Sequence, residues 1–196
     1  MGIYLVDVGA REWCDATEDG MGEVADALDA ELRARGLPPY DGLPEQAGVV
    51  RGSGLRFEEK LIPPMDGFAA LCRSRLSPAD GDFMGSWSIL VPLPLEEAIR
   101  LPVPSAHDNE TVVAGAPRVL ALMERLAAAV ALPVDALPAA CDNLDLTMWF
   151  REGGARRTAA ARPGPWAADL DAAFYVALYL RAAQHSLRRG CPLAHV

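Results

Sequence analysis

Residues 165–190 read PWAADLDAAFYVALYLRAAQHSLRRG, and this stretch decides the fold. Pro165 suits the first turn of a helix, where a backbone N–H has no partner within the helix. Asp169 and Asp171 stand near the positive end of the helix dipole, and two arginines near its negative end precede the stop signal of Gly190. The stretch therefore predicts one helix over 165–190, roughly 37 Å long at the standard rise.

The middle of this helix has no polar side. Residues 172–180 read AAFYVALYL, so aromatic and aliphatic side chains point in every direction around the axis. A membrane span needs about 20 apolar residues, and this run is shorter than that between its flanking charges. We therefore expect a buried central helix, covered on at least two sides by a sheet or by other helices.

The rest of the chain alternates between strand and helix patterns. Strands are predicted at 3–8 (IYLVDV) and 87–91 (WSILV), where apolar and β-branched residues gather. Apolar residues at helical spacing predict an acidic amphipathic helix around 24–32, a short helix over 65–76 and a strongly apolar helix over 116–132.

Three further segments complete the prediction. Apolar residues on either side of Gly52-Ser53-Gly54 predict a hairpin with arms at 49–51 and 55–57. Alternating apolar residues predict a half-exposed strand over 144–150, and residues 153–164 are expected to be a basic loop. Together the patterns predict a single domain over 1–196 of the α+β class, with α/β as the close alternative. A small mixed sheet of about four to six strands would pack with two apolar helices, the C-terminal one long and central.

Negative charge is concentrated in the N-terminal half. The net charge is −9, and residues 1–100 hold 18 acids against 9 bases while residues 101–196 hold 9 of each. Binding to nucleic acid or to an anionic membrane requires clustered Lys and Arg, so neither is expected. A partner protein with a basic surface, or a cation, is the expected ligand.

The cysteines indicate a reducing compartment. Cys14, Cys72, Cys141 and Cys191 are far apart in the sequence and include no CxxC pair, and the N-terminus lacks the pattern of a signal peptide. We therefore expect a cytoplasmic protein. Seventeen of the 18 basic residues are Arg, a bias typical of a GC-rich bacterial genome.

A calcium loop is one candidate site. Residues 15–26 offer oxygen ligands at the required positions of a twelve-residue loop, with Gly20 at the sharp turn; the ligands are Asp15, Thr17, Asp19, Glu23 and Asp26. However, the last position holds Asp rather than the bidentate Glu. The alternative is that Thr17 or Asp19 caps a helix whose first turns are acidic.

The C-terminal tail is a candidate zinc site, with His185, Cys191 and His195 within eleven residues and Cys141 or His107 as a fourth ligand. This spacing matches no structural zinc pattern, so the alternative is a polar His185 and a buried Cys191. The same residues, Cys191, His185 and Cys141, are the candidates for nucleophilic catalysis.

An anion site is predicted at Arg156 and Arg157, which follow two glycines whose backbone amides would wrap the ligand. The alternative is an exposed basic loop without a ligand.

Two functional hypotheses follow. The preferred one is an acidic protein-binding or regulatory module of the inhibitor or immunity type, without catalysis and without a required cofactor, monomeric or homodimeric. The other is a small enzyme that depends on a thiol, a histidine or a metal such as zinc or calcium.

Overall fold

The computed structural model describes residues 2–17, 20–106 and 108–196. Within these residues a mixed six-stranded sheet has the order β2-β1-β6-β3-β5-β4. The strands are β1 (Ile3–Asp7), β2 (Glu58–Leu61), β3 (Ile89–Val91), β4 (Ile99–Leu101), β5 (Thr111–Gly115) and β6 (Leu193–His195). β3 and β5 run parallel, and the other neighbouring pairs are antiparallel. The predicted α+β class and the size of the sheet are confirmed.

Helices occupy the intervening segments. They are α1 (Ala10–Trp13), α2 (Gly22–Ala34), α3 (Asp66–Arg75), α4 (Pro78–Met84), α5 (Ala116–Ala129), α6 (Asp145–Arg151), α7 (Gly154–Ala161) and α8 (Leu170–Arg189), with short 3-10 helices at Val134–Ala136 and Pro165–Ala168. The predicted helices around 24–32, 65–76 and 116–132 correspond to α2, α3 and α5.

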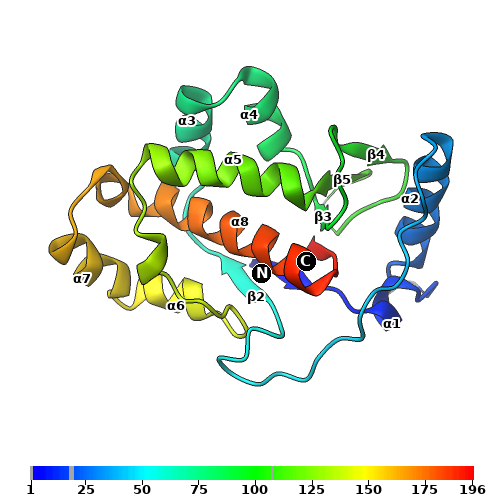
Figure 1. Cartoon of the computed structure of the whole chain (residues 1–196), viewed down its shortest axis with the longest axis horizontal. Helices are drawn as coiled ribbons and strands as arrows, with labels where there is room; N and C mark the ends of the chain where they lie inside the picture. Colours follow the sequence, from blue (N-terminus) through cyan, green and yellow to red (C-terminus); the bar gives the residue numbers. More distant parts are fainter. Residues whose placement is uncertain (1, 18–19, 107) are drawn as a thin grey trace.

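The C-terminal helix α8 is the centre of the main core, as its sequence predicted. Every residue from Ala172 to Leu180 is buried. α8 packs against α5, α3, α6 and the strand β3, so its apolar circumference meets protein on several sides. Figure 1 shows α8 and α5 running side by side across the molecule. Gly190 adopts the left-handed conformation (φ 68°) that ends the helix.

The start of α8 differs from the prediction. Pro165 begins a short 3-10 turn, and Asp169 then has an extended backbone, so the α-helix begins only at Leu170. The Asp169 side chain accepts a hydrogen bond from the backbone N–H of Ala172 at 2.9 Å. Asp169 is therefore the N-cap of α8 rather than a residue of its first turn.

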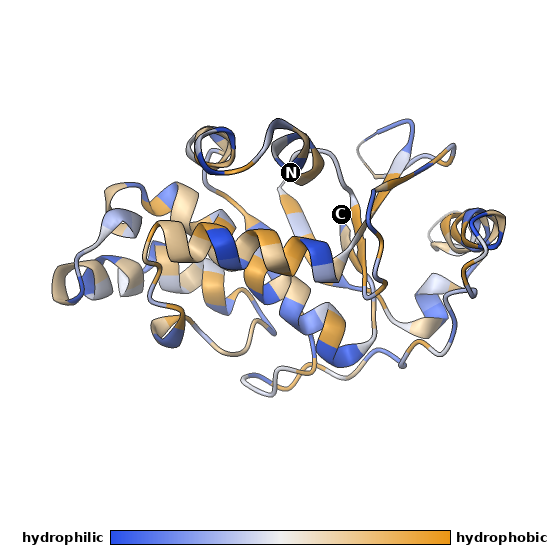
Figure 2. Cartoon of the chain, turned by 45° about the horizontal axis from the view of Figure 1, so that its top comes forward, coloured by the Kyte–Doolittle hydropathy of each residue, from blue (hydrophilic) through white to orange (hydrophobic). Residues whose placement is uncertain are grey.

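The two faces of the sheet build two apolar clusters. One contains α8, α5 and α3, and the other contains α2, Trp13 and Tyr40 with the side chains of β3, β4 and β5 that point away from α8. α1 and α2 thus lie beyond the opposite side of the sheet from α8 (Figure 1). Figure 2 shows much of the strands in the hydrophobic colour, whereas the loops carry a mixture of hydrophilic and hydrophobic colours.

The predicted strand over 144–150 is wrong, because these residues form α6. Leu146 and Phe150 are buried and stand four residues apart, a spacing that also fits one face of a helix. The Glu59 carboxylate of β2 accepts hydrogen bonds from the backbone N–H groups of Leu146 and Thr147, both at 2.8 Å. This contact satisfies the free donors at the N-terminus of α6 and decides between the two patterns.

The predicted hairpin at 49–57 is also wrong. Its first arm is exposed, with Val49 and Val50 at 58% and 59%, and residues 51–56 form turns rather than paired strands. The Asp142 carboxylate accepts hydrogen bonds from the backbone N–H groups of Gly54 and Arg56, both at 3.1 Å. A side chain from a distant segment thus takes the donors that a partner strand would have used.

The predicted basic loop at 153–164 contains the helix α7. Gly153 adopts a left-handed conformation (φ 86°) that turns the chain from α6 into α7. A Cβ atom on Gly154 would lie 2.6 Å from the Trp149 ring, so only glycine allows this approach. The alanines of GARRTAAA favour the helix once the turn is made.

None of the described helices combines the length and the apolar character that crossing a membrane requires.

Candidate functional site

The structure brings His185 and Cys191 together, but with Asp7 rather than with His195. Asp7 ends β1, His185 lies near the end of α8, and Cys191 lies two residues before the start of β6. One potential ligand atom from each lies within 4.8 Å of the others, and the three residues are at most 4% exposed. His195 pairs with Leu5 two residues further along the sheet, and its ring stacks on Trp87.

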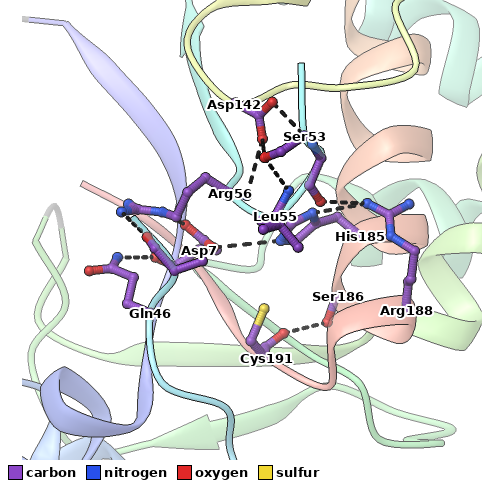
Figure 3. A network of polar contacts seen from close by, with 12 residues as sticks. Asp7, Gln46, Ser53, Leu55, Arg56, Asp142, His185, Ser186, Arg188 and Cys191 are labelled. Carbon is purple, nitrogen blue, oxygen red and sulfur yellow. Dashed lines mark hydrogen bonds and ion pairs between the residues drawn. The ribbon is translucent and has the colours of Figure 1, made fainter. Parts of the chain in front are cut away.

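Asp7 is the centre of a buried network of charged groups, shown in Figure 3. Its Oδ1 atom accepts a hydrogen bond from Nε of Arg56 at 2.8 Å, and its Oδ2 atom lies 3.6 Å from Nε2 of His185. The side chains of Asp7, Arg56 and His185 are only 6%, 15% and 3% exposed. We name these three residues with Cys191 the Asp7 network.

Arg188 fixes the tautomer of His185. Its Nη2 atom lies 3.3 Å from Nδ1 of His185 and donates a hydrogen bond to the Gly54 carbonyl at 3.1 Å. A guanidinium has donors only, so Nδ1 must accept and the ring proton of neutral His185 sits on Nε2. That proton faces Oδ2 of Asp7 at 3.6 Å, which is longer than an ordinary hydrogen bond, so the two groups interact mainly through charge.

The electrostatics of the network favour an ionised Asp7 and a protonated Cys191. Burial raises the pKa of Asp7, but its contacts with His185 and Arg56 outweigh that effect, so the pKa of Asp7 lies below its usual value. Burial is the largest cause that raises the pKa of Cys191, to about 12. The thiol is therefore protonated at neutral pH and lacks the character of a nucleophile.

The network also holds a long irregular segment, residues 36–57, against the sheet. Gln46 donates a hydrogen bond from its side chain to the Asp7 carbonyl at 3.1 Å. Buried Asp142 accepts from Gly54 and Arg56, and Ser53 lies 3.4 Å from the same carboxylate. Figure 1 shows this segment running along one edge of the molecule between α2 and β2. Asp7 and Asp142 are its buried anchors.

Cys141, the other candidate thiol, lies beside a second buried acid, Glu59. Glu59 accepts hydrogen bonds from the Thr147 hydroxyl at 2.6 Å and from two backbone amides of α6. Burial raises the pKa of Glu59, against the lowering effect of these hydrogen bonds, and burial raises the pKa of Cys141 well above its usual value. This arrangement makes Glu59 a cap for α6 and leaves Cys141 protonated.

The calcium ligands do not form a twelve-residue loop. The Asp15 side chain accepts from the backbone N–H of Thr17 at 3.0 Å, and the chain enters α2 at Gly22. Glu23 and Asp26 are consequently exposed residues of that helix, and Asp19 lies outside the described residues. A Cβ atom on Gly20 would lie 2.2 Å from the Asp15 carbonyl oxygen, so the tight turn accounts for this glycine without an ion.

The anion candidates Arg156 and Arg157 lie on α7, where both are exposed. Arg157 donates a hydrogen bond to the Glu152 carbonyl at 3.4 Å. The two glycines that were expected to wrap an anion instead serve the turn and the close packing between α6 and α7.

Sequence reasoning missed Asp7 and a surface concavity near α2. The signal for Asp7 was an acid inside the otherwise apolar run IYLVDV. The concavity lies between α1, α2 and residues 40–43 and has a volume of about 400 Å³. Its carboxylates are Asp26, Asp29 and Asp41, and none of the described residues that line it is basic. The spacing of these acids along the sequence gave no sign that they meet.

Comparison of the chain with protein-family models, with curated proteins and with solved structures finds no match.

Proposed function

We propose that the protein is a regulatory or inhibitory module that binds a partner with a basic surface through its acidic end. The acidic end comprises residues 10–45, which include α1 and α2 and carry ten acids and three arginines. Residues 151–162, which include α7, carry four arginines and one acid. Figure 1 places α2 and α7 at opposite ends of the longest axis, and this separation of charge carries the proposal.

Part of the charge at the acidic end is available to a partner. Glu31 pairs with Arg35, and Asp29 accepts a hydrogen bond from the backbone of Tyr40. Glu23 and Asp26 are exposed on α2, and no ion pair links either to another described residue. A concentrated field of one sign accelerates encounter with a partner of the opposite sign and extends over a Debye length, about 8 Å at physiological salt.

The internal chemistry supports this choice over thiol catalysis. Burial raises the pKa of Cys72 to about 11 and that of Cys191 to about 12, and it raises that of Cys141 as well. Asp7 and His185 face each other and two arginines, in the arrangement expected of groups that hold segments together.

The test is affinity capture from the source cell with three forms of the protein. The Glu23→Gln/Glu45→Gln variant removes two exposed acids from the acidic end, and the Arg156→Gln/Arg157→Gln variant is the matched control at the basic end. We expect the wild type and the control variant to retain the same partner at low salt, and the acidic-end variant to bind that partner more weakly. Added salt should release the partner. Capture that neither salt nor the acidic-end substitutions weaken would contradict the proposal.

A metal-dependent function is the second candidate, favoured by the convergence of Asp7, His185 and Cys191. These side chains are ligand types that zinc accepts, and Arg56 would stay on Oδ1 of Asp7 as an outer partner. Zinc at Nε2 of His185 requires the loss of the proton there, the release of Nδ1 by Arg188 and the ionisation of Cys191.

Elemental analysis of protein purified without chelators or metal-affinity resin tests this second candidate. It predicts stoichiometric zinc and, after exchange, a thiolate-to-cobalt absorption band that Cys191→Ser abolishes. Sub-stoichiometric metal, together with added Co²⁺ that gives no such band, would contradict it.

A further inference from the structure

The concavity at the acidic end combines an apolar interior with a carboxylate rim. Trp13, Tyr40 and Leu43 line it together with alanines of α1 and α2, and Asp26 and Asp41 line it as exposed acids. The only exposed cysteine, Cys14, is also part of its wall. Such a surface fits a long side chain that has an apolar stem and a cationic head.

The aromatic wall is already in place without a ligand. Trp13 and Tyr40 pack edge to face with 5.7 Å between ring centroids, and they are only 2% and 8% exposed. The Tyr40 hydroxyl donates a hydrogen bond to the Gly190 carbonyl at 3.1 Å, and its backbone N–H donates to Oδ1 of Asp29 at 2.8 Å. These contacts fix the wall, so a ligand need not order it.

The acids of the concavity are spread out rather than gathered around one point. Among the described residues, the one group of three or more potential ligands within 4.8 Å of each other is Asp7, His185 and Cys191. Asp26, Asp29 and Asp41 therefore do not converge on a metal ion. An extended organic cation, whose donors spread over several directions, matches this distribution.

We propose that the concavity receives one arginine side chain of the basic partner, an inference that rests on the proposed function. The stem of the arginine lies along the alanines and Leu43, and its guanidinium meets Asp26 and Asp41. A guanidinium has five donors in one plane, which suits two carboxylates on different sides. Asp29 contributes charge, while one of its oxygens stays with Tyr40.

Cys14 provides a direct readout of occupancy. Its alkylation by iodoacetamide, an uncharged reagent, is followed by mass spectrometry in the presence of Nα-acetylargininamide or of Nα-acetylcitrullinamide, in which a neutral urea group replaces the guanidinium. We expect the acetylated arginine amide at tens of millimolar to slow the alkylation of Cys14 saturably. The acetylated citrulline amide should leave the rate unchanged, because it has no cationic group for the rim acids to hold. Equal protection by both compounds, or by neither, overturns the inference.

Two paired variants then locate the site. Asp26→Asn/Asp41→Asn removes the rim acids, and Glu23→Gln/Glu45→Gln removes two exposed acids that do not line the concavity. Each exposed carboxylate contributes up to about fivefold to the affinity for a cation. We therefore expect the concentration that gives half-maximal protection of Cys14 to rise about tenfold in the first variant and to stay unchanged in the second. The inference fails if the arginine compound protects Cys14 equally well in the two variants.

The capture experiment separates this inference from the proposed function. Salt-sensitive capture of a partner, with no protection of Cys14 by the acetylated arginine amide, leaves the function in place and overturns the arginine site. If protection of Cys14 depends on Asp26 and Asp41 but no salt-sensitive partner is captured, the result supports a cation site and contradicts the partner-binding function.

Discussion

The Asp7 network predicts a large loss of stability on the substitution Asp7→Asn. The change keeps the shape of the side chain but removes the charge that Arg56 contacts at 2.8 Å. Removing one partner of a buried ion pair costs about 3–5 kcal/mol, because the other charge stays buried. The Arg56 side chain retains 15% exposure, so we expect a decrease of about 2–4 kcal/mol in the free energy of unfolding. For a chain of this size that lowers Tm by about 5–15 °C.

Urea denaturation followed by tryptophan fluorescence measures the change, with Asp135→Asn as the matched control. Asp135 forms a bidentate ion pair with Arg162 at 2.7 and 3.0 Å, but both side chains are largely exposed. Solvent screens such a pair, so its loss should leave the midpoint nearly unchanged. Equal midpoint shifts in the two variants would refute the reasoning from burial.

The pH dependence gives a second check on Asp7. Its pKa in the folded protein lies below the usual value near 4, so its contribution to stability is fully present above that pH and is lost as the pH falls through the folded-state pKa. The difference in unfolding free energy between wild type and Asp7→Asn should therefore shrink as the pH falls below about 4. A difference that grows in acid would contradict the assigned direction.

Three further predictions follow from local geometry. Ala131 is exposed at the end of α5 with φ 52°, so Ala131→Gly should raise the free energy of unfolding by about 1 kcal/mol in urea titrations, and a decrease would contradict backbone strain there. Iodoacetamide at neutral pH should modify exposed Cys14 in the folded protein but should modify buried Cys191, whose pKa is about 12, only after unfolding. Labelling of Cys191 in the folded protein, detected by mass spectrometry, would contradict this prediction. Glu59→Gln should cost about 2 kcal/mol and speed amide hydrogen exchange at the start of α6, whereas unchanged exchange would argue against capping by Glu59.

Within the candidate site, the sequence singled out two of the three residues that meet. His185 and Cys191 are close in sequence, and the turn at Gly190 brings them near each other. Asp7 joins them because β1 pairs with β6 in antiparallel register, Asp7 opposite Leu193. The same register places His195 at the other end of the short strand, beside Trp87. Local sequence patterns could not predict that β1, near the start of the chain, pairs with β6, near its end.

The sequence by itself determined the long helices of this protein. Apolar spacing, charges at the helix ends and stop signals are local properties, and they identified α2, α5 and α8 and the burial of α8 on all sides. Only the tertiary structure decided α6 and the course of residues 36–57. Glu59 supplies hydrogen-bond acceptors to α6, and Asp142 supplies them to Gly54 and Arg56, in both cases from more than 80 residues away. Where a local pattern fits two conformations, the partner that satisfies the backbone donors selects one, and the fold alone brings that partner near.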